Sequence, residues 1–526
     1  MRSAGRRRLG VELTDIQADA ARSVVEGRDT LLISPTGSGK SAVYQLSGSL
    51  LHGTTIVVSP LLALQEDQLA GLRPLDIGSG AVLSSLHGRR HRTATLDALA
   101  RGDVEFLLLA PEQLVQADVQ KALTAASIDR FVVDEAHCID AWGADFRPDF
   151  QRLGTLRRQL GCPPALALTA TAAPHVEEEI IASLVLDDPL VLIGDLRRPN
   201  ISLHIEGHAT WDAAVEATVD GADGREGSGL VYVSRRQVAE DLARRLDRPE
   251  RPAVAYHGSL PRRRRDWAHA RFRSAEPVVV VATSAFGLGV DAPHVRFVLH
   301  LEAPETIDAY CQEIGRAGRD GAPAEAVLHH VTGTRSGRRF SGGRSKPDAT
   351  LCAAIVAITE PVAIEVMRRY LGVPLGRLLQ AVTVLERQGA VTVGADGVVA
   401  PEGVAWPTVE RRVTEELQRR ADVLRSRQEM VDWLLEGRTC RWSTVLGYLG
   451  QPGHPPCGKC DVCRAGDAPD TEATAPERLH HVEFGPGVVI QRRGDVMVVL
   501  FDRHGYRTLS SSVLEEEQLV AGTDRM

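Results

Sequence analysis

The sequence predicts an α/β protein with two similar parallel-sheet domains in tandem, followed by smaller modules. Three observations support this fold class. Short apolar runs alternate with helical stretches over residues 10–332, four of the eight cysteines cluster between residues 440 and 463, and short strands between glycines follow. A chain of 526 residues is also long enough for about three or four domains, each with its own core.

The first predicted domain spans residues 1–205 and the second spans residues 206–332. Short apolar runs bounded by turn residues are typical of strands that are buried on both faces of a parallel sheet. Because helical stretches separate these runs, we expect helices on both faces of each sheet. The predicted strands are 30–34, 54–59, 105–110, 130–135 and 165–170 in the first domain, and 229–234, 253–257, 278–284 and 295–301 in the second.

Three smaller modules are predicted after these domains. Residues 350–405 contain helices and a short hairpin, a pattern that is typical of a winged helix, although a small helical connector fits it equally well. Residues 406–465 begin with a long amphipathic helix and include the cysteine cluster. Residues 478–520 place short strands between glycine turns, which predicts a small β-barrel.

The charge balance argues against a protein that binds polyanions over its whole surface. The chain has 61 Lys and Arg against 69 Asp and Glu, a net charge of −8. The basic runs at 262–265 and 332–345 are either part of a local basic groove or solvated faces. The N-terminal segment lacks the apolar stretch of a secretory signal, and no apolar run is long enough to span a bilayer. We therefore expect a cytoplasmic protein with no membrane partner.

The segment SPTGSGKS, residues 34–41, lies between a predicted strand and a predicted helix, which is the context that a phosphate loop requires. Glycines let the backbone N–H groups turn toward a polyphosphate, the lysine reaches the outer phosphates, and the last serine offers a hydroxyl to Mg²⁺. Ser34 stands where the usual pattern has a glycine, and the alternative is a Gly/Ser turn without a ligand. The candidate nucleotide-binding residues are Thr36, Gly37, Ser38, Gly39, Lys40 and Ser41.

The segment FVVDEAH predicts the second part of a nucleotide site. An apolar strand that ends in two carboxylates places Asp134 at the edge of the sheet, where it can hold Mg²⁺ through water together with Ser41. Glu135 is the candidate for orienting and deprotonating the attacking water, and His137 is a candidate bridge to the second domain. The alternative is a capped helix start.

The segment QEIGRAGRDG, residues 312–321, predicts the third part. Arg316 and Arg319 are three residues apart, so they lie on one side of a helix or turn. An arginine from a separate domain can stabilise the charge on the γ-phosphate when the two domains close. The alternative is a pair of surface salt bridges.

Four cysteines predict a structural zinc site. Cys440 is followed 17 residues later by Cys457, and then by Cys460 and Cys463 in two CxxC steps. Four thiolates in this spacing suit tetrahedral Zn²⁺ and leave no open coordination position for a substrate. Free thiols, a disulfide and an iron–sulfur cluster are the alternatives.

Together these segments resemble, in order, the motifs of superfamily 2 helicases, and more narrowly those of the RecQ family. The resemblance covers about residues 10–330 and resumes at the cysteines. Besides the segments quoted above, the matching motifs are VVSPLLALQEDQ (57–68), APEQL (110–114), ALTATA (167–172), RPNI (198–201), YHGSL (256–260) and VATSAFGLGVDAPHVRFVLH (281–300).

This resemblance implies two RecA-like P-loop domains and a zinc module, with ATP, Mg²⁺ and Zn²⁺ as cofactors. It also implies ATP-driven translocation on single-stranded DNA with 3′-to-5′ polarity, in DNA repair or recombination and in association with the nucleoid. Gln17 matches the glutamine with which the family reads the adenine edge, but the aromatic residue and arginine that usually precede it are not evident. The resemblance therefore leaves the selectivity for adenine open.

The segment DEAHCIDAWGADFRPDF, residues 134–150, is similar to the aromatic-rich loop of the same family. Aromatic residues make up only 4% of the chain, yet three lie in this loop. Trp142 and Phe146 offer flat faces on which bases can stack, and Arg147 can contact a phosphate. The alternative is that the aromatic rings pack beneath the loop, which we expect for Phe150.

Two departures from the RecQ pattern shape the remaining expectations. About 119 residues separate the arginine motif from Cys440, more than the family pattern needs, and the 350–405 module fills this insertion. After the cysteines, FGPGVV and VLFD resemble the SH3- or Tudor-like module of UvrD-type helicases. Such a barrel binds a protein partner or nucleic acid, or it acts as a stabilising cap.

We therefore expect a DNA-unwinding motor that acts on single-stranded and forked or branched DNA. Two other classes of protein are alternatives. One is an RNA-directed helicase of the same superfamily, against which the aromatic loop and the four cysteines argue. The other is a non-enzymatic scaffold that binds branched DNA. The combination of Lys40, Glu135 and Arg319 is hard to explain in such a scaffold.

Overall fold

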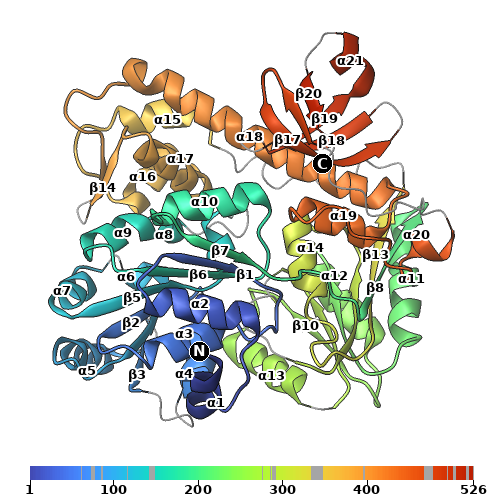
Figure 1. Ribbon diagram of the computed structural model, residues 1–526, viewed down its shortest axis with the longest axis horizontal. Coiled ribbons are helices and arrows are strands. Elements are labelled where there is room, and N and C mark those ends of the chain that lie inside the picture. The colour runs from blue at the N-terminus through green and yellow to red at the C-terminus, as the bar shows by residue number, and fades with distance from the viewer. Residues whose placement is uncertain are drawn as a thin grey trace.

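A computed structural model arranges the chain as two α/β domains, a helical region, a cysteine-bearing module and a C-terminal sheet (Figure 1). The residues that the structure describes are 1–60, 62–72, 78–84, 87–114, 116–140, 148–274, 276–284, 286, 292–332, 347–394, 397–466, 478–493, 496–501, 505–516 and 520–524. No helix among these residues is both long enough and apolar enough to cross a membrane.

The first domain, called lobe 1 below, is built on a parallel seven-stranded sheet in the order β3-β4-β2-β5-β6-β1-β7. Five of its strands are the five predicted ones. The other two, β3 and β7, were not predicted; they are the two edge strands, and their residues are only partly buried. The strands are β1 Thr30–Ile33, β2 Thr54–Val58, β3 Gly80–Leu83, β4 Phe106–Leu109, β5 Ile128–Val133, β6 Ala165–Thr169 and β7 Leu190–Ile193.

The second domain, lobe 2, is built on a parallel six-stranded sheet in the order β10-β11-β9-β12-β13-β8. The four predicted strands are present. Two further strands, β8 and β13, pair with each other along one edge and carry histidines and glutamates among their apolar residues. The strands are β8 Ile201–His208, β9 Ser228–Tyr232, β10 Ala253–Tyr256, β11 Val279–Ala282, β12 Val295–His300 and β13 Ala324–Val331.

Helices cover both faces of each sheet, as predicted (Figure 1). Alternate residues of β1 show why: Leu31 and Ile33 belong to one hydrophobic core and Leu32 belongs to another, and all three are fully buried. The helices of lobe 1 are α1 Arg2–Leu9, α2 Asp15–Val25, α3 Ser41–Gly48, α4 Leu62–Leu72, α5 Arg89–Ala100, α6 Pro111–Leu114, α7 Ala117–Ala125, the 3₁₀ helix η2 Ala136–Ile139, α8 Pro148–Gln151, α9 Leu153–Gln159 and α10 Pro174–Leu184. Those of lobe 2 are α11 Trp211–Asp223, α12 Arg236–Leu246, α13 Arg262–Arg273 and α14 Ile307–Ile314.

The helical region contains three helices and a hairpin around a separate hydrophobic core. Its elements are α15 Ala349–Val356, α16 Ile364–Leu371, α17 Leu375–Arg387, β14 Thr392–Gly394 and β15 Gly397–Val399. The region lies on lobe 1: Arg152 donates to the carbonyl oxygen of Val393 at 3.2 Å, and Arg387 pairs with Glu179. The element order agrees with a winged helix, and that interpretation stays a prediction.

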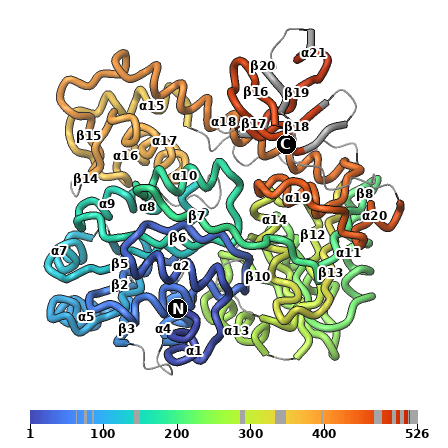
Figure 2. Tube along the Cα trace, in the orientation of Figure 1, coloured from blue at the N-terminus to red at the C-terminus, as the bar shows by residue number. Residues whose placement is uncertain are grey.

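A 31-residue helix, α18 Trp406–Glu436, runs from the helical region past both lobes (Figures 1 and 2). It leads into the cysteine module, residues 437–466, which contains α19 Arg441–Tyr448 and α20 Asp461–Arg464. The C-terminal part follows as an antiparallel sheet in the order β19-β18-β17-β16-β20. The pairings of the described residues do not join β19 to β20, so the predicted closed barrel is not confirmed.

The C-terminal sheet packs on α18 and α19. Thr508 donates to Glu429 at 3.2 Å, and Ile490 lies against Gly447. The elements of this part are β16 Arg478–His481, β17 Gly485–Arg493, β18 Val496–Phe501, β19 Gly505–Ser510, α21 Ser511–Glu516 and β20 Val520–Asp524.

A buried ion pair fixes α18 to lobe 1 beside the predicted catalytic segment. Arg427 of α18 is 7% exposed; it pairs with Asp140, which directly follows η2, and donates to Nε2 of His175 at 2.7 and 3.0 Å. Burial and the neighbouring Arg427 hold the pKa of His175 well below its usual value, so its ring is neutral and accepts these hydrogen bonds. On the other side, Tyr448 of α19 donates to Asp308 of α14 in lobe 2. The α18–α19 segment is thus bound to both lobes.

We expect Arg427→Ala to lower the free energy of unfolding by about 3–5 kcal/mol, because Asp140 would be left as a buried charge without its partner. Urea unfolding followed by circular dichroism measures this change. The control is Arg425→Ala on the same helix, whose side chain is 64% exposed in its pair with Asp422 and should contribute less than about 1 kcal/mol. Equal effects of the two variants would contradict the assignment of Arg427 as the anchor.

Candidate nucleotide site and cysteine centre

The phosphate loop joins the end of β1 to the start of α3. Gly37 and Gly39 have φ values of 80° and 76°, a backbone region that glycine adopts at little cost. Lys40 Nζ donates to the carbonyl oxygens of Ser34 and Pro35 at 2.8 and 3.1 Å, so its side chain lies along the loop. Burial lowers the pKa of Lys40, and the nearby Glu135 and Asp134 oppose this shift. The predicted Lys40, Asp134 and Glu135 are therefore gathered at one place.

Gln17 supports the phosphate loop from α2. Its side-chain amide donates to the carbonyl oxygens of Ser38 and Gly39 at 2.7 and 3.1 Å. Its Oε1 accepts from the backbone N–H of Thr14, which forms a capping box at the start of the helix. The structure therefore places Gln17 as a support of the loop, and its predicted role in reading adenine stays a prediction.

Asp134 and Glu135 lie at the end of β5. Asp134 is 9% exposed and accepts from Gln68 at 2.8 Å and from the backbone N–H of Glu135 at 3.0 Å. Burial and the adjacent Glu135 raise the pKa of Asp134 to about 6, although Lys40 and Gln68 favour its charged form. Glu135 itself has a φ of 52°, a left-handed conformation that costs a non-glycine residue about 1 kcal/mol or more. This backbone geometry is set by the turn from β5 into η2.

His137 bridges the two lobes, as the sequence predicted. Its Nε2 lies 2.8 Å from Nε2 of Gln312 on α14. Because an amide N–H can only donate, the accepting His137 Nε2 is unprotonated and Nδ1 carries the proton. Nδ1 lies 3.1 Å from Oγ1 of Thr169 and 3.4 Å from Oε2 of Glu135. Hydrogen bonds therefore join Thr169 of lobe 1 through His137 to Gln312 of lobe 2, and the carboxylate of Glu135 lies beside the same imidazole.

Arg316 and Arg319 lie in the arginine turn, residues 315–322, directly after α14. A Cβ atom at Gly37 would lie 3.5 Å from Cγ of Arg319, and one at Gly315 would lie 3.5 Å from Oγ1 of Thr36. The turn of lobe 2 therefore touches the phosphate loop of lobe 1. Arg316 is 6% exposed and lies deeper in lobe 2. Of the two predicted arginines, Arg319 is the one that reaches the loop.

The arginine turn is held by the interlobe linker, residues 194–200. Arg198 donates to the carbonyl oxygens of Gly315, Ala317 and Gly318 at 3.2, 3.0 and 2.8 Å. Asn200 donates to those of Gly318 and Ala322 at 2.8 and 2.9 Å. A Cβ atom at Gly318 would lie 2.4 Å from Nδ2 of Asn200, so only glycine fits here. The chain segment that connects the lobes thus shapes the turn that carries Arg319.

The four predicted cysteines come together in the cysteine module. Their sulfur atoms all lie within 4.8 Å of one another, and Sγ of Cys457 and Sγ of Cys463 are 4.0 Å apart. Tetrahedral Zn–S bonds of about 2.3 Å require S–S separations of about 3.8 Å, so the four thiols fit Zn²⁺. Backbone N–H groups point at three of the sulfurs, as at Cys440, which accepts from the N–H of Cys457 at 3.2 Å. All four are free of disulfides.

The cysteine module contacts the interlobe linker and the first residue of β8. Trp442 donates to the carbonyl oxygen of Ile201 at 3.0 Å, Lys459 donates to that of Pro199 at 2.9 Å, and Gln451 donates to that of Gly194 at 2.8 Å. The chain of contacts therefore runs from the thiol cluster, through the linker, to the arginine turn.

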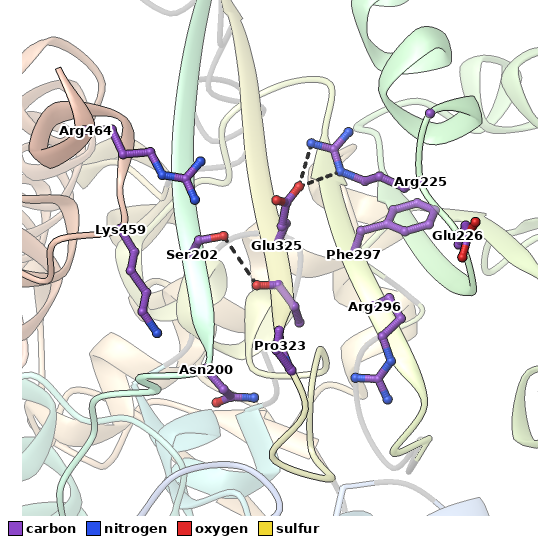
Figure 3. A pocket seen from close by; sticks show the side chains of 12 residues that line it. Asn200, Ser202, Arg225, Glu226, Arg296, Phe297, Pro323, Glu325, Lys459 and Arg464 are labelled. Atoms are coloured by element: carbon purple, nitrogen blue, oxygen red, sulfur yellow. Dashed lines mark hydrogen bonds and ion pairs between the residues drawn. The ribbon is translucent and has the colours of Figure 1, made fainter.

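An open cavity of about 620 Å³ lies where the cysteine module meets lobe 2 (Figure 3). Lys459 and Arg464 line one side, and Arg296 and Arg225 line the other. Arg225 pairs with Glu325 at 2.9 Å. The phosphate loop does not line this cavity, so it is a separate feature from the predicted nucleotide site.

Several predicted residues remain to be placed. Trp142, Phe146 and Arg147 lie outside the described residues, so their predicted contact with DNA stays a prediction. Phe150 is fully buried in the main core, as expected. Ser41, Thr36 and Ser38 lie in the phosphate loop, as the sequence placed them.

Four residues of the site were missed: Gln68, Thr169, Arg198 and Gln312. All four lie in the motifs that were recognised, which is the signal that could have found them.

Comparisons with known proteins agree with this geometry. The sequence matches three families: DEAD/DEAH box helicase over residues 14–180, helicase conserved C-terminal domain over 213–321, and RecQ zinc-binding over 407–464. A crystal structure of the DUF1998 helicase MrfA bound to DNA shares the fold, with a TM-score of 0.53 at 16% identity, over 77% of this chain and 62% of that one. Fold and site together define a two-lobed helicase of the DEAD/DEAH-box class.

Two curated relatives narrow the class. The ATP-dependent DNA helicase RecQ of Synechocystis sp. is 31% identical over 482 residues, which cover 86% of this chain and 95% of that protein. The probable ATP-dependent DNA helicase RecS of Bacillus subtilis is 40% identical over 318 residues, which cover 60% of this chain but only 64% of that protein. The chain belongs to the RecQ family of helicases. The match to the RecQ zinc-binding family also favours Zn²⁺ over an iron–sulfur cluster at the four cysteines.

We expect Asp134→Asn to stabilise the protein in the absence of nucleotide and Mg²⁺ at pH 7.5. The folded pKa of about 6 lies above the unfolded value of about 3.9, so ionising Asp134 costs folding free energy as the pH rises through 6. The stabilisation should reach at most about 3 kcal/mol above pH 7 and disappear below pH 4. Thermal unfolding at a series of pH values measures it. A stabilisation that is independent of pH would contradict the assigned cause.

We expect Arg198→Ala to lower kcat for ATP hydrolysis by about 10- to 100-fold while KM for ATP changes little, because the turn that carries Arg319 would lose three hydrogen bonds. Steady-state ATPase assays measure both constants. Arg197→Ala is the matched control, since that neighbouring arginine makes a longer ion pair with the exposed Asp195, at 3.8 Å. A lowered affinity for ATP with an unchanged kcat would contradict the role of Arg198.

Proposed function

We propose that this chain is an ATP-dependent DNA helicase that moves along single-stranded DNA and separates duplexes. The observation that supports this most is the approach of the arginine turn of lobe 2 to the phosphate loop of lobe 1, where Arg319 lies over Gly37. A site that is completed only when two lobes meet is suited to convert ATP hydrolysis into relative movement of those lobes.

In this proposal the phosphates of ATP bind at Thr36, Gly37, Ser38, Gly39 and Lys40. Ser41 and Asp134 would hold Mg²⁺, which would neutralise charge at the outer phosphates. The backbone N–H groups of the loop and the N-terminus of α3 orient the same oxygens.

Glu135 accepts a proton from the attacking water. Its carboxylate is directed by the left-handed backbone at this position and lies near His137, whose proton is on Nδ1. Arg319, with Arg316 behind it, stabilises the charge of the transition state. The His137–Gln312 hydrogen bond connects the surroundings of Glu135 to lobe 2.

DNA binds through Trp142, Phe146 and Arg147, which follow Asp140 in the chain. Bases that stack on Trp142 and Phe146 change the position of the segment that begins at Asp134, so DNA stimulates hydrolysis. The protein acts in the cytoplasm, in association with the nucleoid, with 3′-to-5′ polarity, on single-stranded and forked or branched DNA in repair or recombination. The C-terminal sheet contacts a protein partner.

The test is DNA-stimulated ATP hydrolysis. We expect single-stranded DNA to stimulate the wild type, Glu135→Gln to abolish hydrolysis, and Trp142→Ala to remove the stimulation while the rate without DNA is largely kept. Trp142→Phe is the matched control, because it keeps an aromatic face and should keep most of the stimulation.

Two further arms separate the alternative functions. RNA that stimulates as well as DNA of the same length would favour an RNA-directed helicase, and an absence of hydrolysis in the wild type would favour a scaffold. Unwinding of duplexes with a 3′ tail, but not of those with a 5′ tail, is the expected polarity. Full stimulation of Trp142→Ala would contradict the proposed role of the loop.

A further inference from the structure

The edge of lobe 2 carries a second group of potential metal ligands, about which the proposed function makes no statement. It consists of Glu206 and His208 on β8 and His329 on β13. These are the two strands that carry Ser202 and Glu325 in Figure 3. The group contains no cysteine and is separate from the four thiols of the cysteine module.

The strand register brings the three side chains together. Glu206 lies directly opposite His329 in the parallel pairing of β8 with β13, and His208 follows two residues after Glu206. Residues two apart in a strand project from the same face of a sheet, so all three share one face. Backbone hydrogen bonds between paired strands hold these positions, and the group is therefore pre-arranged by the sheet.

The distances within the group match those around a small divalent ion. Nε2 of His208 and Nδ1 of His329 are 3.0 Å apart, and Nδ1 of His329 and Oε2 of Glu206 are 3.5 Å apart. All three ligand atoms lie within 4.8 Å of one another. Zinc bonds of about 2.0–2.2 Å at tetrahedral angles require ligand separations of about 3.3 Å. The observed separations bracket this value.

The environment also suits a bound cation. His329 is only 2% exposed and Glu206 is exposed, so the group is anchored in the sheet on one side and open to solvent on the other. Two imidazoles and a carboxylate form a ligand set that Zn²⁺ prefers, and water can supply a fourth ligand. His208 and the carboxylate of Glu206 both approach Nδ1 of His329, at 3.0 and 3.5 Å, so the three side chains converge on one point.

We propose that Glu206, His208 and His329 form a second zinc site that fastens β8 to β13. The site lies near the point where the chain leaves lobe 2. At this point the backbone N–H and the hydroxyl of Thr332 both donate to the carbonyl oxygen of His208, at 2.8 and 3.1 Å. Bound zinc stiffens the edge strand that also supports the cysteine module, through the hydrogen bond from Trp442 to Ile201 at the start of β8.

The test is metal stoichiometry of the full chain after equilibration with Zn²⁺ and removal of unbound ion. We expect two zinc ions per wild-type chain and one in His208→Asn and in Glu206→Gln. His330→Asn is the matched control: this histidine neighbours His329 but projects from the opposite face of β13, so the variant should keep two ions. One ion in the wild type, or two in His208→Asn and Glu206→Gln, would overturn the proposal.

Replacing Zn²⁺ by Co²⁺ identifies the ligands from the absorption spectrum, independently of how stable a variant protein is. The first equivalent should give intense thiolate-to-cobalt charge-transfer absorption from the four cysteines. The second equivalent should add only weak visible bands that are typical of nitrogen and oxygen ligands, and these should be absent in Glu206→Gln. Thiolate absorption that continues to grow with the second equivalent would also overturn the proposal.

Discussion

The arrangement of this protein depends on the hydrogen bonds that hold the arginine turn. Five hydrogen bonds from the side chains of Arg198 and Asn200 to carbonyl oxygens of the turn add to the backbone hydrogen bonds that the turn makes itself. Because these two residues belong to the segment that joins the lobes, the path of the chain between the lobes and the position of Arg319 are determined together. The nucleotide site is therefore a property of the two lobes and their connection, and neither lobe contains it alone.

The modules that follow lobe 2 also contact the segments on which the position of the arginine turn depends. The cysteine module contacts the linker through Gln451 and Lys459 and the start of β8 through Trp442, and α18 contacts lobe 1 through Arg427. The thiol cluster is therefore connected to the arginine turn through the linker, although it lies in a separate module.

Much of the fold could be predicted because buried parallel strands have a simple signature. Runs such as VVVA are apolar at every position, and TLLI is apolar after its buried threonine, since both faces of each central strand are covered. The missed strands of lobe 2 have a mixed composition: β8 contains His204, Glu206 and His208, which face a partly open surface. The missed edge strands of lobe 1, β3 and β7, are apolar, and composition does not explain why they were missed. The phosphate loop, the two carboxylates, the arginines and the cysteines were predictable from spacing. Gln312, Arg198 and Thr169 lie in recognised motifs, but their partners could not be predicted, because these contacts join segments that are distant in the chain.

The attachment of α18 and α19 to both lobes has a mechanical consequence. Lobe 1 is held through Asp140 and His175, and lobe 2 through Asp308 and the start of β8. Rotating one lobe away from the other strains one of these attachments unless the α18–α19 segment bends with it. The separation of the lobes is therefore coupled to the bending of α18, and the stiffness of this one long helix limits how far the lobes can move apart.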